Sequence, residues 1–225
     1  MFTSRGGIVP RKKAVIFDLD GTLLDTIADI ADSMNRVLAG HGLPVHERSA
    51  YLDFVGGGMD VLVQRALPEG SDPGELAPKL LASMREEYAA SWRAASKPYP
   101  GIPGLLDGLS SRGVPFCVLS NKIDSFTREM VSALLGPWKF FAVRGLGPGR
   151  ARKPDPGQAL ELAARLGVQP SEILFVGDSD VDMQTARGAG MVPVGVLWGY
   201  QSRVRLLSGG AELLLQKPGD LLEHL

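Results

Sequence analysis

The sequence has little cysteine, little histidine and no charge excess, and each shortage narrows what the chain can be. Its single cysteine, Cys117, excludes a disulfide within the chain and fits a reducing compartment. Cys117 lies in the apolar stretch PFCVLS, so we expect a buried side chain and not a nucleophile. The three histidines have no ligand spacing relative to one another, which argues against a histidine metal site.

Long apolar runs are also absent. No stretch approaches the roughly 18 residues that a membrane span needs, and residues 1–13 lack the apolar segment of a signal peptide. The net charge of −1 offers no basic excess for nucleic acid or an anionic membrane. We therefore expect a cytoplasmic monomer or homodimer that acts on small molecules, without nucleic-acid or membrane partners.

Short apolar runs are present, and they recur along the second half of the chain. Their near-continuous hydrophobicity is typical of parallel strands that are covered on both faces. Between them lie helical patterns at residues 124–136, 154–167 and 180–190, each ending near a glycine. This alternation predicts an α/β fold with a doubly wound, Rossmann-like parallel sheet. The expected strands are residues 14–18, 115–120, 140–145, 173–178 and 193–198.

The alternation stops between the first two strands, where only helical patterns occur. Apolar residues at helical spacing form one stripe from Ile27 to Leu38 and a second from Leu76 to Trp92. We expect an all-helical cap domain at residues 24–96, inserted into a core domain made of residues 1–23 and 97–225. The proline-rich KPYPGIPG would link the two, and Asp25 would cap the first cap helix.

Acidic side chains follow two of the predicted strands. Asp18 and Asp20 come at the end of the first strand, and Asp178 comes at the end of the run ILFVGD. Ligands of such sheets bind at the carboxyl ends of the strands, and oxygen ligands are those that Mg²⁺ prefers. Burying these charges is costly unless a partner is bound. A metal-assisted phosphoryl transfer would use such a set of carboxylates.

Four stretches carry a resemblance to a known family. DLDGT, LSNK, RKP and VGDSDVDMQTARGAG, in this order, resemble the motifs of the haloacid dehalogenase superfamily, and the inserted cap is similar to the first cap type of that family. The resemblance covers nearly the whole chain. It implies a Mg²⁺-dependent enzyme that works through an aspartyl-phosphate intermediate.

The resemblance also implies roles for the acidic residues and one lysine. Asp18 would be the nucleophile. Asp20 would be the general acid and base, with its backbone carbonyl on the metal. Lys153 would neutralise charge between Asp18 and the phosphate. Asp178 would join Asp18 and Asp20 in binding Mg²⁺, and Asp182 would hold a metal-bound water or orient the lysine.

The phosphate would be held by further residues of the same motifs. Thr22 and Ser120 would donate hydrogen bonds to the transferring phosphoryl group, together with the backbone amide of Asn121 and the ammonium group of Lys153. Each role suits its residue type, since hydroxyls stabilise oxyanions and lysine is a flexible point charge.

The kind of reaction follows from Asp20. Displacing a halide needs no proton on the leaving group, so an acid at this position favours phosphate chemistry over dehalogenation. A phosphomutase of the β-phosphoglucomutase type has the same motifs and is the alternative. A scaffold protein with an inactive site is disfavoured because Asp18, Asp20 and Lys153 are all present.

The cap contains a clue to the substrate. The glycine-rich turn FVGGGMDVLVQRAL is similar to a stretch of the phosphoglycolate phosphatases, and we expect it to contact the far end of a small anionic substrate. The best substrate guess is therefore 2-phosphoglycolate, with pyrophosphate, a nucleotide or a sugar phosphate as alternatives. The expected specificity residues are Gly56, Gly57, Gly58, Met59 and Arg65.

Overall fold

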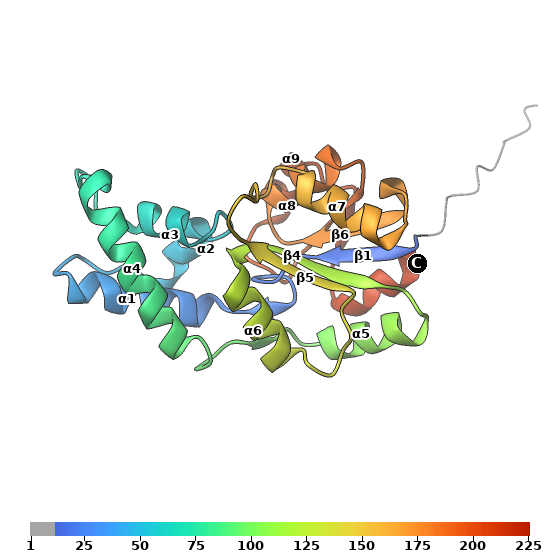
Figure 1. Cartoon of the computed structure of the whole chain (residues 1–225), viewed down its shortest axis with the longest axis horizontal. Coiled ribbons are helices and arrows are strands. Elements are labelled where there is room, and N and C mark those ends of the chain that lie inside the picture. Colours follow the sequence, from blue (N-terminus) through green and yellow to red (C-terminus); the bar gives the residue numbers. More distant parts are fainter. Residues whose placement is uncertain (1–11) are drawn as a thin grey trace, which may run out of the picture.

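A six-stranded parallel sheet forms the centre of the protein, for which a computed structural model describes residues 12–225 (Figure 1). The first part of the expected core, residues 1–11, lies outside the described residues. Every neighbouring pair in the sheet is parallel, in the order β5-β4-β1-β6-β7-β8. The strands are β1 (Ala14–Phe17), β4 (Phe116–Ile123), β5 (Ala142–Leu146), β6 (Ile173–Gly177), β7 (Val192–Val196) and β8 (Leu213–Leu215).

Helices cover both faces of this sheet (Figure 1). Ala14 and Ile16 of β1 pack in one apolar cluster with side chains of α7 and α8, whereas Val15 and Phe17 pack with side chains of α5 and α6. Both faces are therefore buried, which explains why the strands read as continuous apolar runs. The helices are α5 (Ile102–Ser111), α6 (Asp124–Leu134), α7 (Gly157–Leu166), α8 (Asp180–Gly188) and α9 (Arg203–Gly209), with short 3₁₀ turns at Pro170–Glu172 and Pro218–His224.

The predicted fold class is confirmed, and the five expected strands all occur within a few residues of their predicted places. The edge strand β8 was not predicted, because its apolar run LLL is only three residues long. Cys117 is buried in β4, as expected. Across residues 12–225, no helix combines the length and the apolarity that crossing a membrane requires.

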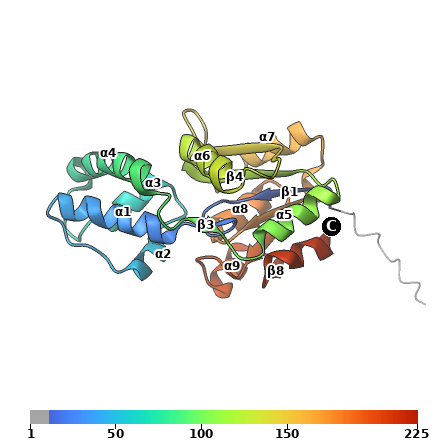
Figure 2. The same cartoon turned by 90° about the horizontal axis from the view of Figure 1, so that it is seen from below.

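A second group of helices lies beyond the carboxyl ends of the strands (Figures 1 and 2). We call α1–α4 the helical insert. Its two long helices pack along each other, and the predicted stripes supply buried residues such as Met34 and Met84. The insert consists of α1 (Ile27–Gly40), a 3₁₀ turn (Arg48–Ala50), α2 (Tyr51–Phe54), α3 (Met59–Ala66) and α4 (Pro73–Ser91).

The chain enters and leaves the insert side by side. The short strands β2 (Leu24–Asp25) and β3 (Lys97–Pro98) pair antiparallel. The buried carboxylate of Asp29 in α1 accepts hydrogen bonds from the backbone N–H groups of Ala95 and Ser96 and from the Ser96 hydroxyl, at 2.7–3.1 Å. One carboxylate thus fixes the returning segment to the first helix of the insert.

The start of α1 corrects one expectation. The residue before the helix is Thr26, and not Asp25. Asp25 is paired with Lys97 in the β2–β3 ladder, which keeps its backbone extended and delays the helix. The Thr26 hydroxyl does not cap the helix either, since it donates to Asp20 at 2.8 Å.

Salt bridges also connect the insert side of the molecule to the core, near the carboxyl ends of the strands. Three salt bridges cross between them, each with an N–O distance of 2.7 Å. Their side chains are partly or largely exposed, so each contributes little stability alone. The pairs are Arg152–Asp60, Arg93–Glu129 and Arg205–Asp53.

Candidate active site

Asp18 directly follows the last residue of β1. Its backbone N–H donates to Val176 O at 2.9 Å, which continues the pairing of β1 with β6 for one residue. The chain then turns sharply at Gly21, whose φ is 81° and whose absent Cβ would lie 2.2 Å from Asp178 Oδ2. Only glycine allows this approach. The strand and the turn therefore deliver the Asp18 carboxylate, only 8% exposed, against Asp178.

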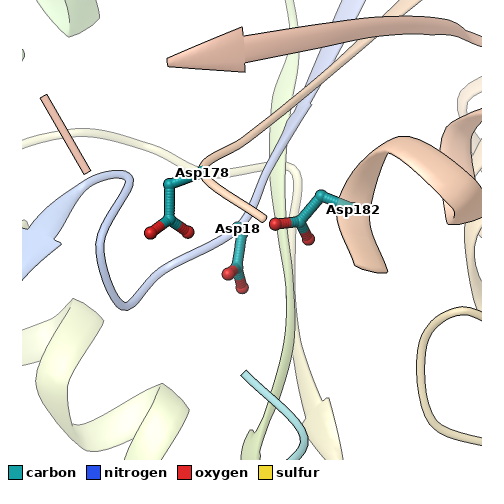
Figure 3. A group of neighbouring side chains, drawn as sticks. All are labelled: Asp18, Asp178 and Asp182. Carbon is teal, nitrogen blue, oxygen red and sulfur yellow. The ribbon is translucent and has the colours of Figure 1, made fainter. Parts of the chain in front are cut away.

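Three carboxylates converge at this place (Figure 3). Asp178 follows β6, Asp182 lies in the first turn of α8, and oxygens of Asp18, Asp178 and Asp182 lie within 4.8 Å of one another. Asp182 is completely buried, and Ser179 donates to its Oδ2 from both the backbone N–H (3.1 Å) and the hydroxyl (2.6 Å). This capping box fixes the third carboxylate in place.

Lys153 brings one positive charge to the cluster. Its Nζ is 2.8 Å from Asp18 Oδ1 and 2.7 Å from Asp182 Oδ1, and its side chain is 3% exposed. Burial alone would lower the pKa of Lys153, but Asp18 and Asp182 outweigh it and raise that pKa. Lys153 therefore stays protonated.

The carboxylates respond in the opposite way to burial. Burial raises the pKa of Asp18 to about 6, although Lys153 pulls it down, and Asp182 adds to the rise. Burial, followed by the charges of Asp182 and Asp18, also raises the pKa of Asp178 well above its usual value. One ammonium group does not compensate three buried carboxylates.

The cluster fits a divalent cation. Asp18 Oδ1 forms an ion pair with Lys153 Nζ at 2.8 Å but has no hydrogen bond to any other residue in the described part of the chain. Within residues 12–225, Asp178 is hydrogen-bonded only by the Tyr200 N–H at 2.8 Å and the Thr22 hydroxyl at 3.5 Å. Carboxylate oxygens with free lone pairs and excess negative charge are the donor set of a hard cation. Asp18 and Asp178 would hold it, with Asp182 beside them.

This arrangement predicts how pH and metal affect stability. Between the ordinary aspartate pKa of 3.8 and about 6, folded Asp18 keeps a proton that the unfolded chain has lost. Stability without metal should therefore fall as the pH rises from about 4 to about 6, by at most about 3 kcal/mol from this group. Added Mg²⁺ should reverse the loss, and more so at higher pH.

Thermal unfolding in EDTA and in Mg²⁺ at a series of pH values measures this effect. The variant Asp178→Asn provides the control, because the loss of one ligand and one charge should flatten both the pH dependence and the response to Mg²⁺. Equal melting temperatures in EDTA and Mg²⁺ at pH 8 would contradict a metal site at this cluster.

Asp20 points away from the three carboxylates. Its side chain, 19% exposed, pairs with Lys122, whose Nζ lies 3.1 and 3.0 Å from the two carboxylate oxygens. The Thr26 hydroxyl donates to Oδ1 at 2.8 Å. If a metal binds between the three clustered aspartates, only the backbone carbonyl of Asp20 would be available to it, and Asp20 lines a neighbouring pocket.

The expected phosphate ligands are gathered at the same edge. Thr22, Ser120 and Asn121 are all buried, with Ser120 and Asn121 in the second half of β4. The Asn121 side chain accepts from the Lys153 N–H at 2.8 Å and donates to Lys153 O and Gly56 O, both at 3.0 Å. The Asn121 side chain thus connects the backbone at Lys153 to the backbone of the helical insert at Gly56. The sequence did not indicate this role.

The glycine-rich turn of the insert closes over this edge. Gly56, Gly58 and Met59 line a pocket together with Asp20, Ser120 and Asn121. Gly58 has a φ of 100°, and a Cβ there would lie 3.1 Å from Asn121 O, so a side chain would push the turn away from β4. Gly57 O accepts a hydrogen bond from Arg152 at 2.8 Å.

Arg65 does not reach the pocket. Its guanidinium donates to the backbone carbonyls of Asp53 and Phe54, at 2.8 and 3.4 Å, and it fixes the turn between α2 and α3. The reason is geometric: Arg65 lies in the last turn of α3, whereas the pocket meets the first turn.

Two residues that the sequence analysis did not assign complete the site. Lys122 pairs with Asp20. Tyr200 connects Asp178 to Asp20: its backbone N–H donates to Asp178, and its hydroxyl lies 3.1 Å from the Thr26 hydroxyl, which in turn donates to Asp20. Both follow strands of the sheet or lie at their ends. The rule that ligands gather at carboxyl ends could therefore have pointed to both.

Comparison with known proteins gives a consistent result. Residues 15–196 match a family model described as haloacid dehalogenase-like hydrolase. The phosphoglycolate phosphatase of Aquifex aeolicus is 30% identical over 211 residues, which cover 94% of this chain and 95% of that protein. The N-acetylmuramic acid 6-phosphate phosphatase of Pseudomonas aeruginosa is 32% identical over 216 residues, covering 96% and 95%.

A solved structure supports the same grouping. A crystal structure from Lactobacillus delbrueckii subsp. bulgaricus, ascribed to a phosphoglycolate phosphatase, superposes with a TM-score of 0.88 at 30% identity. It covers 95% of this chain and 98% of that one. The two curated relatives bear the names of different phosphate monoesters, so they agree on the reaction and differ in the substrate.

Proposed function

Because this chain belongs to the haloacid dehalogenase-like hydrolases and is a phosphoric monoester hydrolase, we propose that it is a Mg²⁺-dependent phosphatase that transfers phosphate through Asp18. The observation that carries the proposal is the Asp18 carboxylate. It is buried at the end of β1, where Oδ1 forms an ion pair with Lys153 at 2.8 Å and the carboxylate lies beside Asp178.

The chemistry would proceed in two displacements. An Asp18 oxygen attacks phosphorus, the bond to the ester oxygen breaks, and protonated Asp20 gives its proton to the leaving alkoxide. Asp20, now ionised, then takes a proton from a water molecule whose oxygen attacks the aspartyl-phosphate. The products are the alcohol and inorganic phosphate, and Asp18 is regenerated.

The remaining residues would lower the electrostatic barrier. Lys153 neutralises charge where the anionic nucleophile meets the anionic phosphate, and Asp182 orients that lysine. Bound Mg²⁺ would supply further positive charge to the phosphate oxygens. Ser120, in β4, and Thr22, in the turn after β1, would donate to the equatorial oxygens from buried positions.

The helical insert would select the substrate. We propose that residues 24–96 act as a cap over the strand ends, with Gly56, Gly58 and Met59 facing the leaving group. The relatives that are named phosphoglycolate phosphatases support 2-phosphoglycolate as the substrate. Closure of the cap would exclude bulk water during the first displacement and admit one water for the second.

Phosphate release tests the proposal. The panel contains 2-phosphoglycolate, N-acetylmuramic acid 6-phosphate, β-glucose 1-phosphate, pyrophosphate and nucleoside monophosphates, each assayed with Mg²⁺ and with EDTA. We expect release from 2-phosphoglycolate that is lost in EDTA. Equal rates across the panel would retain the chemistry and remove the substrate assignment, and glucose 6-phosphate formed without free phosphate would indicate a mutase.

A further inference from the structure

The pocket between the sheet and the insert has two chemically different walls. On the core side it is polar, with Asp20, Ser120 and Asn121 where the phosphate end would lie. On the insert side it is apolar apart from the backbone of the glycine-rich turn and one tyrosine. The apolar side chains are Ile30, Leu52, Val55, Met59, Leu62 and Met84.

Lys122 lies at the boundary between these walls. Within residues 12–225, the part of the chain that the structure describes, it is the only positively charged residue lining this pocket. Its side chain is 7% exposed. Its Nζ lies 2.9 Å from the hydroxyl of Tyr88 in α4 and 4.6 Å from the centre of the same ring.

Two elements hold the Lys122 ammonium in place. Asp20 binds it from the core, and Tyr88 binds it from the insert. The Tyr88 ring is itself fixed edge-to-face against Phe126, with 5.3 Å between ring centroids. Burial alone would lower the pKa of Lys122, but Asp20 and Tyr88 raise it overall. A protonated amine is therefore presented at a defined position in a largely apolar pocket.

We propose that Lys122 determines substrate specificity by pairing with a carboxylate of the substrate's leaving group, close to the ester oxygen. The leaving oxygen must reach Asp20 to receive its proton, and Lys122 Nζ is 3.0 Å from the same carboxyl group. An anion one carbon from the ester oxygen then falls beside Lys122. The inference rests on the proposed phosphatase function, because it places the leaving oxygen at Asp20.

The apolar wall makes this pairing selective. A carboxylate that enters the pocket loses water, and an ammonium at short range compensates it more strongly than it would in bulk solvent. A neutral leaving group gains nothing from Lys122. The site should therefore prefer phosphate monoesters of hydroxy acids.

Two substrates that differ in one group test the inference. For wild type, Lys122→Met and Lys122→Gln, kcat/KM is measured with 2-phosphoglycolate and with 2-hydroxyethyl phosphate, which replaces the carboxylate by an alcohol. We expect wild type to prefer the carboxylate, and the ratio of the two constants to fall about 10- to 100-fold in both variants, as for the loss of one charge-assisted hydrogen bond. The matched control is Lys79→Met, an exposed lysine of α4, which should leave the ratio unchanged.

Each outcome decides a different question. If both constants fall together and the ratio stays at its wild-type value, Lys122 acts only through Asp20 and the inference is overturned. If wild type itself shows no preference for the carboxylate, the inference fails without any variant. If wild type releases phosphate from no monoester in Mg²⁺, the proposed function fails instead.

Discussion

Asp18→Asn should lose at least about 10⁴-fold in kcat while its metal-free form melts at or above the wild-type temperature. The loss follows because an amide cannot form the aspartyl-phosphate, and removal of a covalent nucleophile is among the most damaging changes to an enzyme. The stability follows from the pKa of about 6 for Asp18, since at pH 8 the native state pays to keep this carboxylate ionised in a buried site. Asparagine has the same shape without the charge.

Activity and stability are thus expected to change in opposite directions. Phosphate release and thermal unfolding in EDTA at pH 8 measure the two quantities on one preparation. Mass spectrometry of acid-quenched wild type should find one added HPO₃ group on the peptide that contains Asp18, and none in the variant. An Asp18→Asn protein that keeps more than about 1% of kcat would exclude Asp18 as the nucleophile.

Lys153→Met should have the largest effect on stability, about 3–5 kcal/mol at pH 8. The substitution keeps the length of the side chain but leaves Asp18 and Asp182, 8% and 0% exposed, without their shared ammonium group. Breaking a buried ion pair from one side is costly because the remaining charges stay buried. Activity should be lost as well, since the phosphate would meet three uncompensated carboxylates.

Denaturant unfolding at several pH values measures this loss. The difference from wild type should shrink toward pH 5, because carboxylates that have lost their partner take up protons more readily. Lys139→Met, at an exposed position, is the matched control and should change little. A double variant with Asp182→Asn should recover part of the stability of Lys153→Met. An equal loss at pH 5 and pH 8 would mean that packing, and not charge, dominates at this position.

The chain order of the motifs made much of this arrangement predictable. Asp18 and Asp178 each follow an apolar run, and in a parallel sheet such positions meet at one edge. The strands were recognisable because both faces of the sheet are buried, which removes any alternation. Asp20 lies outside this carboxylate cluster, and its role as general acid and base stays a prediction.

Contacts between the insert and the core were beyond prediction. Lys122 follows Asn121 in LSNK, but only the position of α4 brings the Tyr88 hydroxyl to it. Likewise, the Asn121 side chain finds Gly56 and Lys153 from opposite directions, 65 residues before it and 32 after it. Periodicity reports which face of a helix is buried, not which residue of a distant segment will meet it. The expectation that Arg65 lies in the pocket was wrong for this reason: its position in the sequence does not reveal which segment its side chain contacts.

The paired crossings at β2 and β3 have a consequence for how this protein could change over evolutionary time. The insert departs and returns at adjacent points, with Asp25 opposite Lys97 and the Asp29 carboxylate joining the two segments. A helical module of another size could be grafted between the same two points without altering the register of any strand in the parallel sheet. Substitutions on the inner surface of the insert can likewise alter the pocket's shape while β1, β4 and β6 keep their carboxyl-end residues in place. The preference for one ester over another can therefore diversify while the reaction itself is inherited unchanged.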